Sequence, residues 1–144
     1  KNNNKFPSLE VLNLNNNGIV KIENLEKLVS LKELRMNDNE VLKIENLESL
    51  SSLKLLHLSN NKIQTTENIN NLSSLQVLDL SKNKITTIEN LDSLPSLRIL
   101  DVSMNAVETI HNLKFIRSIK TLDLDYDVKK KFNLLKYPYG TSSW

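Results

Sequence analysis

The sequence predicts an α/β solenoid, with a curved parallel β-sheet on its concave face and short 3₁₀ turns on its convex face. Two observations support this fold. Residues 75–96 (LQVLDLSKNKITTIENLDSLPS) repeat, almost position by position, the pattern of the segments on either side. Repeats of this length bury a continuous core only by stacking on their neighbours. Leucine or isoleucine also recurs at a constant interval and defines position 1 of each coil, at Leu9, Leu31, Leu53, Leu75, Leu97 and Ile119.

The first six positions, L-x-x-L-x-L, alternate apolar and polar residues, as in a short strand with one buried face. Positions 3, 5 and 7 are expected to lie exposed on the concave face. Positions 4 and 6 are expected to point inward and stack into one core, as Leu12 and Leu14, Leu34 and Met36, Leu56 and Leu58, Leu78 and Leu80, Leu100 and Val102, and Leu122 and Leu124.

Asparagine recurs at two further positions of the coil. At position 9 the chain leaves the strand, and an amide that both donates and accepts is expected to bond the backbone of its own coil and the next. Asp127, at position 9 of the sixth coil, lacks the donors; it indicates either the end of this ladder or sequence drift at an exposed end. Position 9 is occupied by Asn17, Asn39, Asn61, Asn83 and Asn105.

Position 16 is also asparagine, followed by L-x-x-L. Asparagine is a good helix N-cap, and the segment is too short for an α-helix, so a single 3₁₀ turn is expected there. Thr66 replaces the isoleucine of position 14, and its hydroxyl is expected to bond nearby backbone. The asparagines of position 16 are Asn24, Asn46, Asn68, Asn90 and Asn112.

The same alignment divides the chain into three parts. Residues 1–8 are expected to be the end of a preceding repeat or an N-terminal tail, because residues 6–8 match residues 94–96 and the chain therefore begins in mid-repeat. Residues 9–128 form five full coils and a degenerate sixth. Residues 129–144 are expected to form a C-terminal cap, with Phe132 and Leu135 in apolar positions. The aromatic residues gathered at this end are Tyr126, Phe132, Tyr137, Tyr139 and Trp144.

Composition argues against several classes of function. The net charge of +2, from 19 basic and 17 acidic residues, is too balanced for a surface that tracks phosphates, so direct nucleic-acid binding is not expected. With two histidines, two glycines and no cysteine, neither a metal site, a cofactor nor a small-molecule substrate is expected. The missing cysteines favour the cytoplasm, the nucleus or both. No apolar run approaches the length of a membrane span.

The 22-residue coil with its I-E-N-L phrase, as at residues 88–91, resembles the leucine-rich repeat over residues 6–128. It is most similar to the subclass typified by the nuclear regulatory subunit of protein phosphatase 1 and the leucine-rich light chain of axonemal dynein. The resemblance implies a non-catalytic protein-interaction module that binds another protein on its concave face. A regulatory subunit of a phosphatase is the first specific function it implies, and a structural subunit of a dynein or cytoskeletal assembly is the alternative.

Position 3 places Leu55, Val77 and Ile99 in one row on a face expected to be wet. This row indicates either an interface or the preference of β-branched residues for strands. At position 5 the row ends in Asp79, Asp101 and Asp123, which a basic partner, or Arg98 and Lys120 within the chain, could neutralise. The predicted partner-binding residues are Glu33, Arg35, Leu55, His57, Val77, Asp79, Ile99, Asp101, Met104, Asp123 and Tyr126.

Catalysis is the remaining class of function. His57, Asp79 and Ser59 lie on neighbouring strands of the predicted sheet and superficially suggest a hydrolytic triad. However, all three occupy positions that the repeat exposes in every coil, and serine recurs at Ser81 and Ser103 without any sign of an oxyanion hole. The sequence therefore predicts that the protein is not an enzyme.

Overall fold

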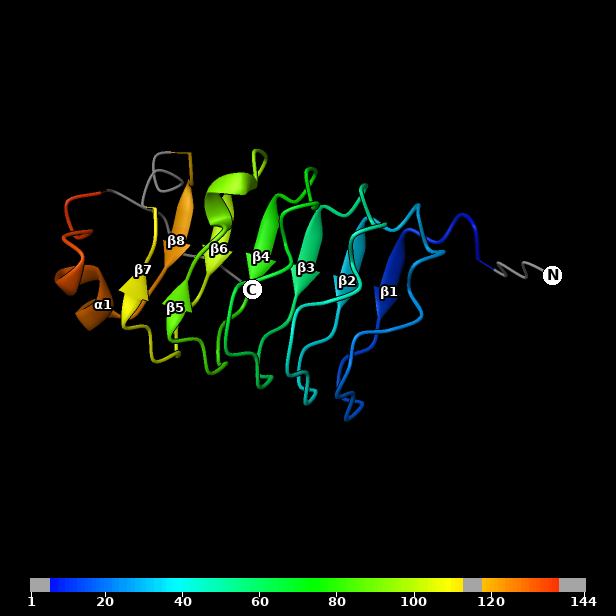
Figure 1. Ribbon diagram of the computed structural model, residues 1–144, viewed down its shortest axis with the longest axis horizontal. Helices are drawn as coiled ribbons and strands as arrows, with labels where there is room; N and C mark the ends of the chain where they lie inside the picture. The colour runs from blue at the N-terminus through cyan, green and yellow to red at the C-terminus, as the bar shows by residue number, and fades with distance from the viewer. Residues whose placement is uncertain (1–5, 113–117, 138–144) are drawn as a thin grey trace.

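A computed structural model, which describes residues 6–112 and 118–137, shows a solenoid of parallel strands (Figure 1). The main sheet has six strands in the order β1-β2-β3-β4-β6-β8, which lie side by side along the molecule from the N-terminal end. The predicted parallel solenoid is confirmed. The strands are β1 (Val11–Asn13), β2 (Glu33–Arg35), β3 (Leu55–His57), β4 (Val77–Asp79), β6 (Ile99–Asp101) and β8 (Thr121–Asp123).

The strands pair in the register that the sequence period predicts. Leu34 pairs with Leu56, Leu56 with Leu78 and Leu78 with Leu100, so each leucine meets its equivalent in the next coil. These leucines are fully buried and belong to one continuous hydrophobic core. Leu12 in the first coil is only partly buried. Stacking of like residues on like residues therefore forms the core, as the alternation of positions 4 and 6 predicts.

A second, smaller sheet lies beneath the main one in Figure 1 and was not foreseen from the sequence. It pairs β5 (Thr87–Ile88) with β7 (Thr109–Ile110), and Thr65 extends it by a single bridge to Thr87. Position 13 is threonine in these three coils but lysine in the first two, at Lys21 and Lys43. Because β-branched residues favour the extended backbone and lysine does not, this sheet begins in the third coil.

The asparagines of position 9 bond the backbone as expected, but to the preceding coil and not the next one. Asn61 accepts a hydrogen bond from the backbone N–H of Val41 at 2.9 Å and donates to the carbonyl of Met36 at 2.9 Å. It also donates to the carbonyls of Leu58 and Ser59 in its own coil. The equivalent bonds of Asn39, Asn83 and Asn105 likewise join each coil to the one before it, whereas Asn17 donates to carbonyls of its own coil.

The asparagines of position 16 do not act as side-chain N-caps, so that prediction was wrong. Their φ angles lie between 55° and 64°, in the left-handed region that asparagine tolerates better than most residues. Asn90 precedes the 3₁₀ helix η1 (Leu91–Ser93) without a side-chain cap, whereas Asn46 and Asn68 donate to carbonyls of the preceding coil. The second coil turns at the same place by the bond from Leu50 N–H to Leu47 O, which spans three residues as in a single 3₁₀ turn, and the fourth coil extends this turn into η1.

Thr66 is fully buried, and its hydroxyl bonds the backbone as expected. It donates to the carbonyl oxygen of Glu89 at 2.6 Å and accepts from the N–H of the same residue at 2.7 Å. The threonine therefore links its coil to the following one at a position where the other coils have isoleucine. This local loss of apolar volume is compensated by two hydrogen bonds, and it needs no functional explanation.

The last coil ends in α1 (Tyr126–Lys131), which lies beyond β8 at the C-terminal end of the stack (Figure 1). Asp127 lies in its first turn and Lys129–Lys131 in its last, where each charge interacts favourably with the helix dipole. Val128 and Phe132 pack against the core and Leu134 is buried, but Leu135 is 48% exposed, contrary to expectation. Tyr139 and Trp144 lie outside the described residues.

Candidate interaction surface on the concave face

The concave face has a hollow of about 310 Å³ over its C-terminal half. It is formed by outward positions of the third, fourth and fifth coils and by Asn37 of the second, which lie in register because equivalent residues of successive coils pair. The hollow brings together four of the residues predicted to bind a partner, together with polar residues that the sequence analysis did not assign to partner binding. It is lined by Asn37, His57, Ser59, Asp79, Ser81, Lys82, Asp101, Ser103 and Met104.

The outward positions are less exposed than expected in the middle of the stack. His57, Asp79 and Asp101, at position 5, are exposed by only 9%, 4% and 7%. Asn13 and Arg35 at the same position near the N-terminal end are exposed. Neighbouring strands about 4.8 Å away on both sides cover these shorter side chains, whereas the long side chain of Arg35, also on an inner strand, remains exposed. The polar residues of the hollow are therefore partly removed from water.

The apolar row of position 3 is also more covered than predicted. Val77 is 9% exposed, and its neighbours Leu55 and Ile99 have intermediate exposure. They pair directly across β3, β4 and β6. The row therefore forms a half-buried apolar band next to the hollow, instead of the fully wet patch expected from the sequence.

Charges on the concave face are arranged differently along the stack. In the first three coils Glu33 lies between two bases, with its Oε1 2.5 Å from Arg35 Nε and 3.7 Å from His57 Nε2. In the last three coils, Asp79, Asp101 and Asp123 pair in register on β4, β6 and β8. Along the sheet, position 5 therefore changes from Arg35 and His57, which flank Glu33 of position 3, to a row of carboxylates.

The carboxylates of the hollow are oriented by the serines two residues further on. Asp79 Oδ1 accepts hydrogen bonds from Ser81 N and Oγ at 3.0 and 2.7 Å. Asp101 Oδ1 accepts the equivalent bonds from Ser103 at 3.0 and 2.6 Å. Serine at position 7 therefore fixes each carboxylate against its own strand. The recurrence of D-x-S in two successive coils is the signal by which sequence analysis could have predicted these bonds between serine and aspartate.

Burial shifts the titration of two groups in the hollow. Desolvation lowers the pKa of His57, although the nearby charges of Asp79 and Glu33 act to raise it. Desolvation raises the pKa of Asp79, against the hydrogen bonds from Ser81. Both shifts favour the neutral form of the group, as expected when a charge loses contact with water.

The lowered pKa of His57 predicts a loss of stability in mild acid. Below its ordinary pKa of 6.5 the unfolded chain binds a proton that the folded chain does not, so the free energy of unfolding falls as the pH drops from 6.5 through the lower folded value. His57→Asn is expected to flatten this fall, as measured by urea titrations between about pH 7 and about pH 5. The exposed His111 is the control, because His111→Asn is expected to keep the dependence of the wild-type protein.

Position 8, at the rim of the hollow, has an unusual backbone in every full coil. Its residues have φ between 55° and 60°, which asparagine or aspartate tolerates in the first three coils. In the fourth and fifth coils the same left-handed conformation is adopted by Lys82 and Met104, which cost about 1 kcal/mol or more in it. Both side chains line the hollow, and Met104 is 62% exposed. Tyr126, at the next position 8, begins α1 and is also exposed.

Comparison with known proteins gives the family. The sequence matches the family described as Leucine Rich repeats (2 copies) over residues 7–50, 51–93 and 73–115. The chain belongs to the leucine-rich-repeat family. No relative among the curated proteins matches it. The specific resemblance to the phosphatase regulatory subunit or the dynein light chain is not supported by these comparisons.

Solved structures of leucine-rich-repeat proteins share the fold. A leucine-rich-repeat protein of Leptospira interrogans is 29% identical with a TM-score of 0.77, covering 83% of this chain and 32% of that one. Internalin C2 of Listeria monocytogenes is 28% identical with a TM-score of 0.76, covering 83% and 53%. The chain in the TLR13–ssRNA13 complex is 34% identical with a TM-score of 0.58, covering 68% and 15%. The present chain thus spans a third to a half of the length of the first two.

Leucine-rich repeats are typically non-catalytic interaction scaffolds, and these comparisons indicate no catalytic family. The geometry of the hollow is consistent with this. The hydroxyl of Ser59 lies 2.8 Å from that of Ser81, and Ser81 in turn donates to Asp79. Ser59, Ser81 and Asp79 therefore form a structural chain across the strands.

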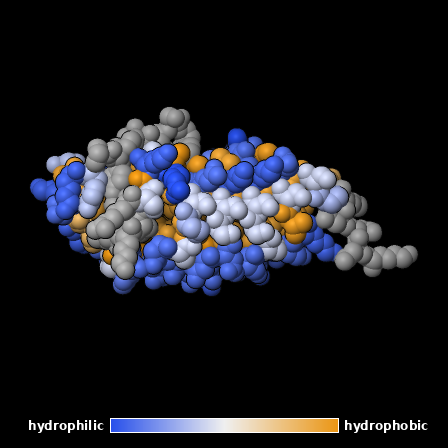
Figure 2. Space-filling model, turned by 90° about the horizontal axis from the view of Figure 1, so that it is seen from above, coloured by the Kyte–Doolittle hydropathy of each residue, from blue (hydrophilic) through white to orange (hydrophobic). Residues whose placement is uncertain are grey.

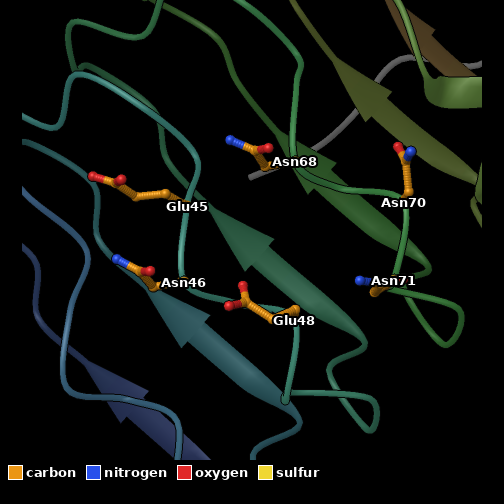
Figure 3. A pocket seen from close by; sticks show the side chains of 6 residues that line it. All are labelled: Glu45, Asn46, Glu48, Asn68, Asn70 and Asn71. Atoms are coloured by element: carbon orange, nitrogen blue, oxygen red, sulfur yellow. The ribbon is translucent and has the colours of Figure 1, made fainter.

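A second hollow of about 430 Å³ lies between the second and third coils, away from the concave face (Figure 3). Its side chains come from corresponding positions of two neighbouring turns, with Glu45, Asn46 and Glu48 on one and Asn68, Asn70 and Asn71 on the next. Asn46 and Asn68 already bond the backbone of a preceding coil. Among residues 6–112 and 118–137, no cluster of three histidine or acidic side chains is arranged to hold a metal ion. This hollow therefore follows from the repeat geometry of the leucine-rich fold.

The surface outside the hollow is mixed, with Val20, Val29 and Leu42 as scattered exposed hydrophobic side chains. Seen from above, one long side of the solenoid shows hydrophilic side chains along its length, with small hydrophobic groups between them (Figure 2). Within the described part of the chain, no helix is long and apolar enough to cross a membrane. The concave hollow and its apolar band are therefore the strongest candidate for a binding surface on this leucine-rich-repeat chain.

Proposed function

We propose that the protein is a non-catalytic protein-binding module whose partner lies over the hollow on the C-terminal half of the concave face. The observation that carries the proposal is the rim of the hollow. Lys82 and Met104 adopt a left-handed backbone for which the corresponding residues of the first three coils are asparagine or aspartate. Unfavourable backbone conformations of this kind concentrate at functional sites, where the side chain is needed in place.

The chemistry of the hollow favours a partner segment with a basic and an apolar side chain. Asp79 and Asp101 lie on its floor with their Oδ1 atoms held by serines, and Leu55, Val77 and Ile99 form the apolar band beside it. Arg98 donates to the carbonyl oxygen of Pro95 in the fourth coil and to that of Leu97 in its own coil. A lysine or arginine of the partner would interact favourably with the negative row, and association is expected to slow as salt is added.

Two specific partners follow from the resemblance of the I-E-N-L coil to its subclass. A phosphatase catalytic subunit is the first, since Glu33, Asp79, Asp101 and Asp123 are present where the related regulatory subunit has an acidic strip. A dynein or cytoskeletal assembly is the second. Either partner would place the protein in the cytoplasm or the nucleus, a location that the lack of cysteine also favours.

Replacing Met104 with asparagine tests the proposal without damaging the fold. Asparagine suits the left-handed backbone, so Met104→Asn is expected to raise the free energy of unfolding by about 1 kcal/mol while partner capture is lost. Capture is measured with the purified chain as bait, followed by identification of the proteins that the variant no longer retains. Recovery of a phosphatase catalytic subunit supports the first partner, and recovery of dynein chains or tubulin supports the second.

Leu42→Asn is the matched control, because Leu42 is 49% exposed and does not line the hollow. It is expected to capture the same proteins as the wild-type chain. If Leu42→Asn loses the partner and Met104→Asn retains it, the binding surface is not on the concave face. The association rate is then measured at rising salt concentration. It falls with salt if the partner is basic and stays constant if the partner is neutral.

A further inference from the structure

We infer that the partner segment on the concave face is an amphipathic helix that lies along the stack of coils, with acidic residues on one flank and basic residues on the other. The inference rests on the proposed function, and it adds the shape of the partner segment and the order of its charges. Three parallel rows of different chemistry, basic, apolar and acidic, run across the strands β3, β4, β6 and β8 and carry the inference.

The basic row lies at position 2, at the edge of the main sheet where the strands begin. Its exposed bases are Lys54, Arg98 and Lys120, and the exposed Gln76 lies between the first two. A backbone ladder joins these residues. Each N–H donates to the position 2 carbonyl of the preceding coil, at 2.8 Å for Gln76 and Lys120 and at 2.9 Å for Arg98. The three bases therefore lie in one line along the stack.

The charges of this row are not neutralised within the described part of the chain. The three bases form no ion pair there, whereas Lys32, at the same position of the second coil, pairs with Glu10 at 2.9 Å. The five residues that precede each of the three bases in the sequence include no aspartate or glutamate. The edge from the third coil to the sixth is therefore positively charged over a length of about 14 Å, which is three strand spacings.

The apolar band of position 3 and the row of carboxylates at position 5 run parallel to this basic edge. Both are in register, because their members pair directly across neighbouring strands. Positions 2 and 5 are three residues apart along a strand, so the basic and acidic rows are separated by about 10 Å. The concave face therefore changes from basic through apolar to acidic over a distance close to the diameter of an α-helix, about 10–12 Å.

The width of this pattern favours a helix over an extended segment. A strand laid along the stack turns alternate side chains toward the surface in a single line, so it would contact one row only. A helix turns an apolar stripe toward the surface and carries the residues on either flank over the neighbouring rows. Because a helix rises about 1.5 Å per residue, about ten residues reach from the third coil to the sixth.

The two charged rows decide which helix fits. A helix with lysine on both flanks is attracted by Asp79 but repelled by Lys54 and Lys120, and a helix with glutamate on both flanks is repelled by the carboxylates. A helix with unlike flanks meets an opposite charge on each side. Turning such a helix end for end exchanges its flanks, so the two rows also fix the direction in which it lies.

Three designed peptides of about ten residues test the inference. All have the same leucine stripe and a covalent brace that holds them helical. One carries glutamate on one flank and lysine on the other, the second carries lysine on both flanks, and the third carries glutamate on both. Binding of each labelled peptide to the whole chain is measured by fluorescence anisotropy at low salt. The peptide with unlike flanks is expected to bind about tenfold more tightly than either of the others.

Reversing the charge of the basic edge is expected to change this preference. For the double variant Lys54→Glu/Lys120→Glu, the peptide with lysine on both flanks should become the tightest binder of the three. Lys43→Glu/Lys84→Glu is the matched control, because it changes the net charge equally at two exposed lysines outside the three rows and the hollow. This control is expected to keep the order of affinities of the wild-type chain.

Three outcomes would overturn the inference. If the peptide with lysine on both flanks binds the wild-type chain as tightly as the one with unlike flanks, the basic edge plays no part, although the proposed function stands. If the two double variants change the affinities equally, the preference comes from net charge and not from the edge. If no peptide binds, the helix is excluded, and the capture experiment with Met104→Asn decides the proposed function separately.

Discussion

Replacing Asn61 with alanine is expected to lower the free energy of unfolding by about 3 kcal/mol or more, since each buried backbone group left without a partner costs about 1–3 kcal/mol. Asn61 is buried and bonds four backbone groups, the N–H of Val41 and the carbonyls of Met36, Leu58 and Ser59. Two of these groups belong to the second coil and two to the third. The substitution therefore removes a link between coils as well as a local turn.

Asn17→Ala is the matched control, because it makes the same change at the same position of the coil. Asn17 is exposed, and its side chain donates only to carbonyls of its own coil, where water can replace it. The expected loss is about 1 kcal/mol or less. Urea titration followed by circular dichroism measures both variants. Equal losses at the two positions would show that the links between coils contribute little to stability.

The sequence period predicts the fold well because it specifies which residues stack. Every main-sheet pair joins equivalent positions of adjacent coils, so repetition alone places Leu56 beside Leu78 and Leu78 beside Leu100. It does not specify backbone angles. Asparagine favours both N-caps and the left-handed region, so the pattern at Asn46 or Asn68 fits either role until the φ angle is known. The repeat pattern also does not tell whether the asparagines of position 9 bond the preceding coil or the next one.

The candidate site was predicted less completely than the fold. Alternation along a strand predicts which side chains point outward, and His57, Asp79, Asp101 and Met104 do meet in one hollow. Alternation does not tell how far neighbouring strands cover those side chains, so the burial of Asp79 could not be foreseen. The left-handed conformation of Lys82 could not be predicted from the sequence either, because lysine rarely adopts it. Whether the eleven predicted residues bind a partner stays a prediction.

Replacing Leu78 with alanine is expected to lower the free energy of unfolding by about 2–5 kcal/mol, the usual cost of removing a fully buried leucine side chain. Leu78 is 0% exposed and pairs with Leu56 on one side and Leu100 on the other. The surrounding coils are held by hydrogen-bond ladders on both sides, so they have little freedom to collapse into the cavity. Leu42→Ala, at a 49% exposed site, is expected to change the same quantity by less than about 0.5 kcal/mol.

Leu12→Ala makes this comparison a test of stacking itself. Leu12 occupies the same position of the coil as Leu78 but pairs with a neighbouring strand on one side, at Leu34, and is only partly buried. If stability is a sum of contacts between adjacent coils, the loss for Leu12 should lie between those for Leu78 and Leu42. The free energies of unfolding of the Leu12→Ala, Leu78→Ala and Leu42→Ala variants are obtained from the midpoints and slopes of urea titrations. A loss at Leu12 as large as that at Leu78 would mean that each coil is stabilised mainly from within, and that adjacent coils contribute little to one another.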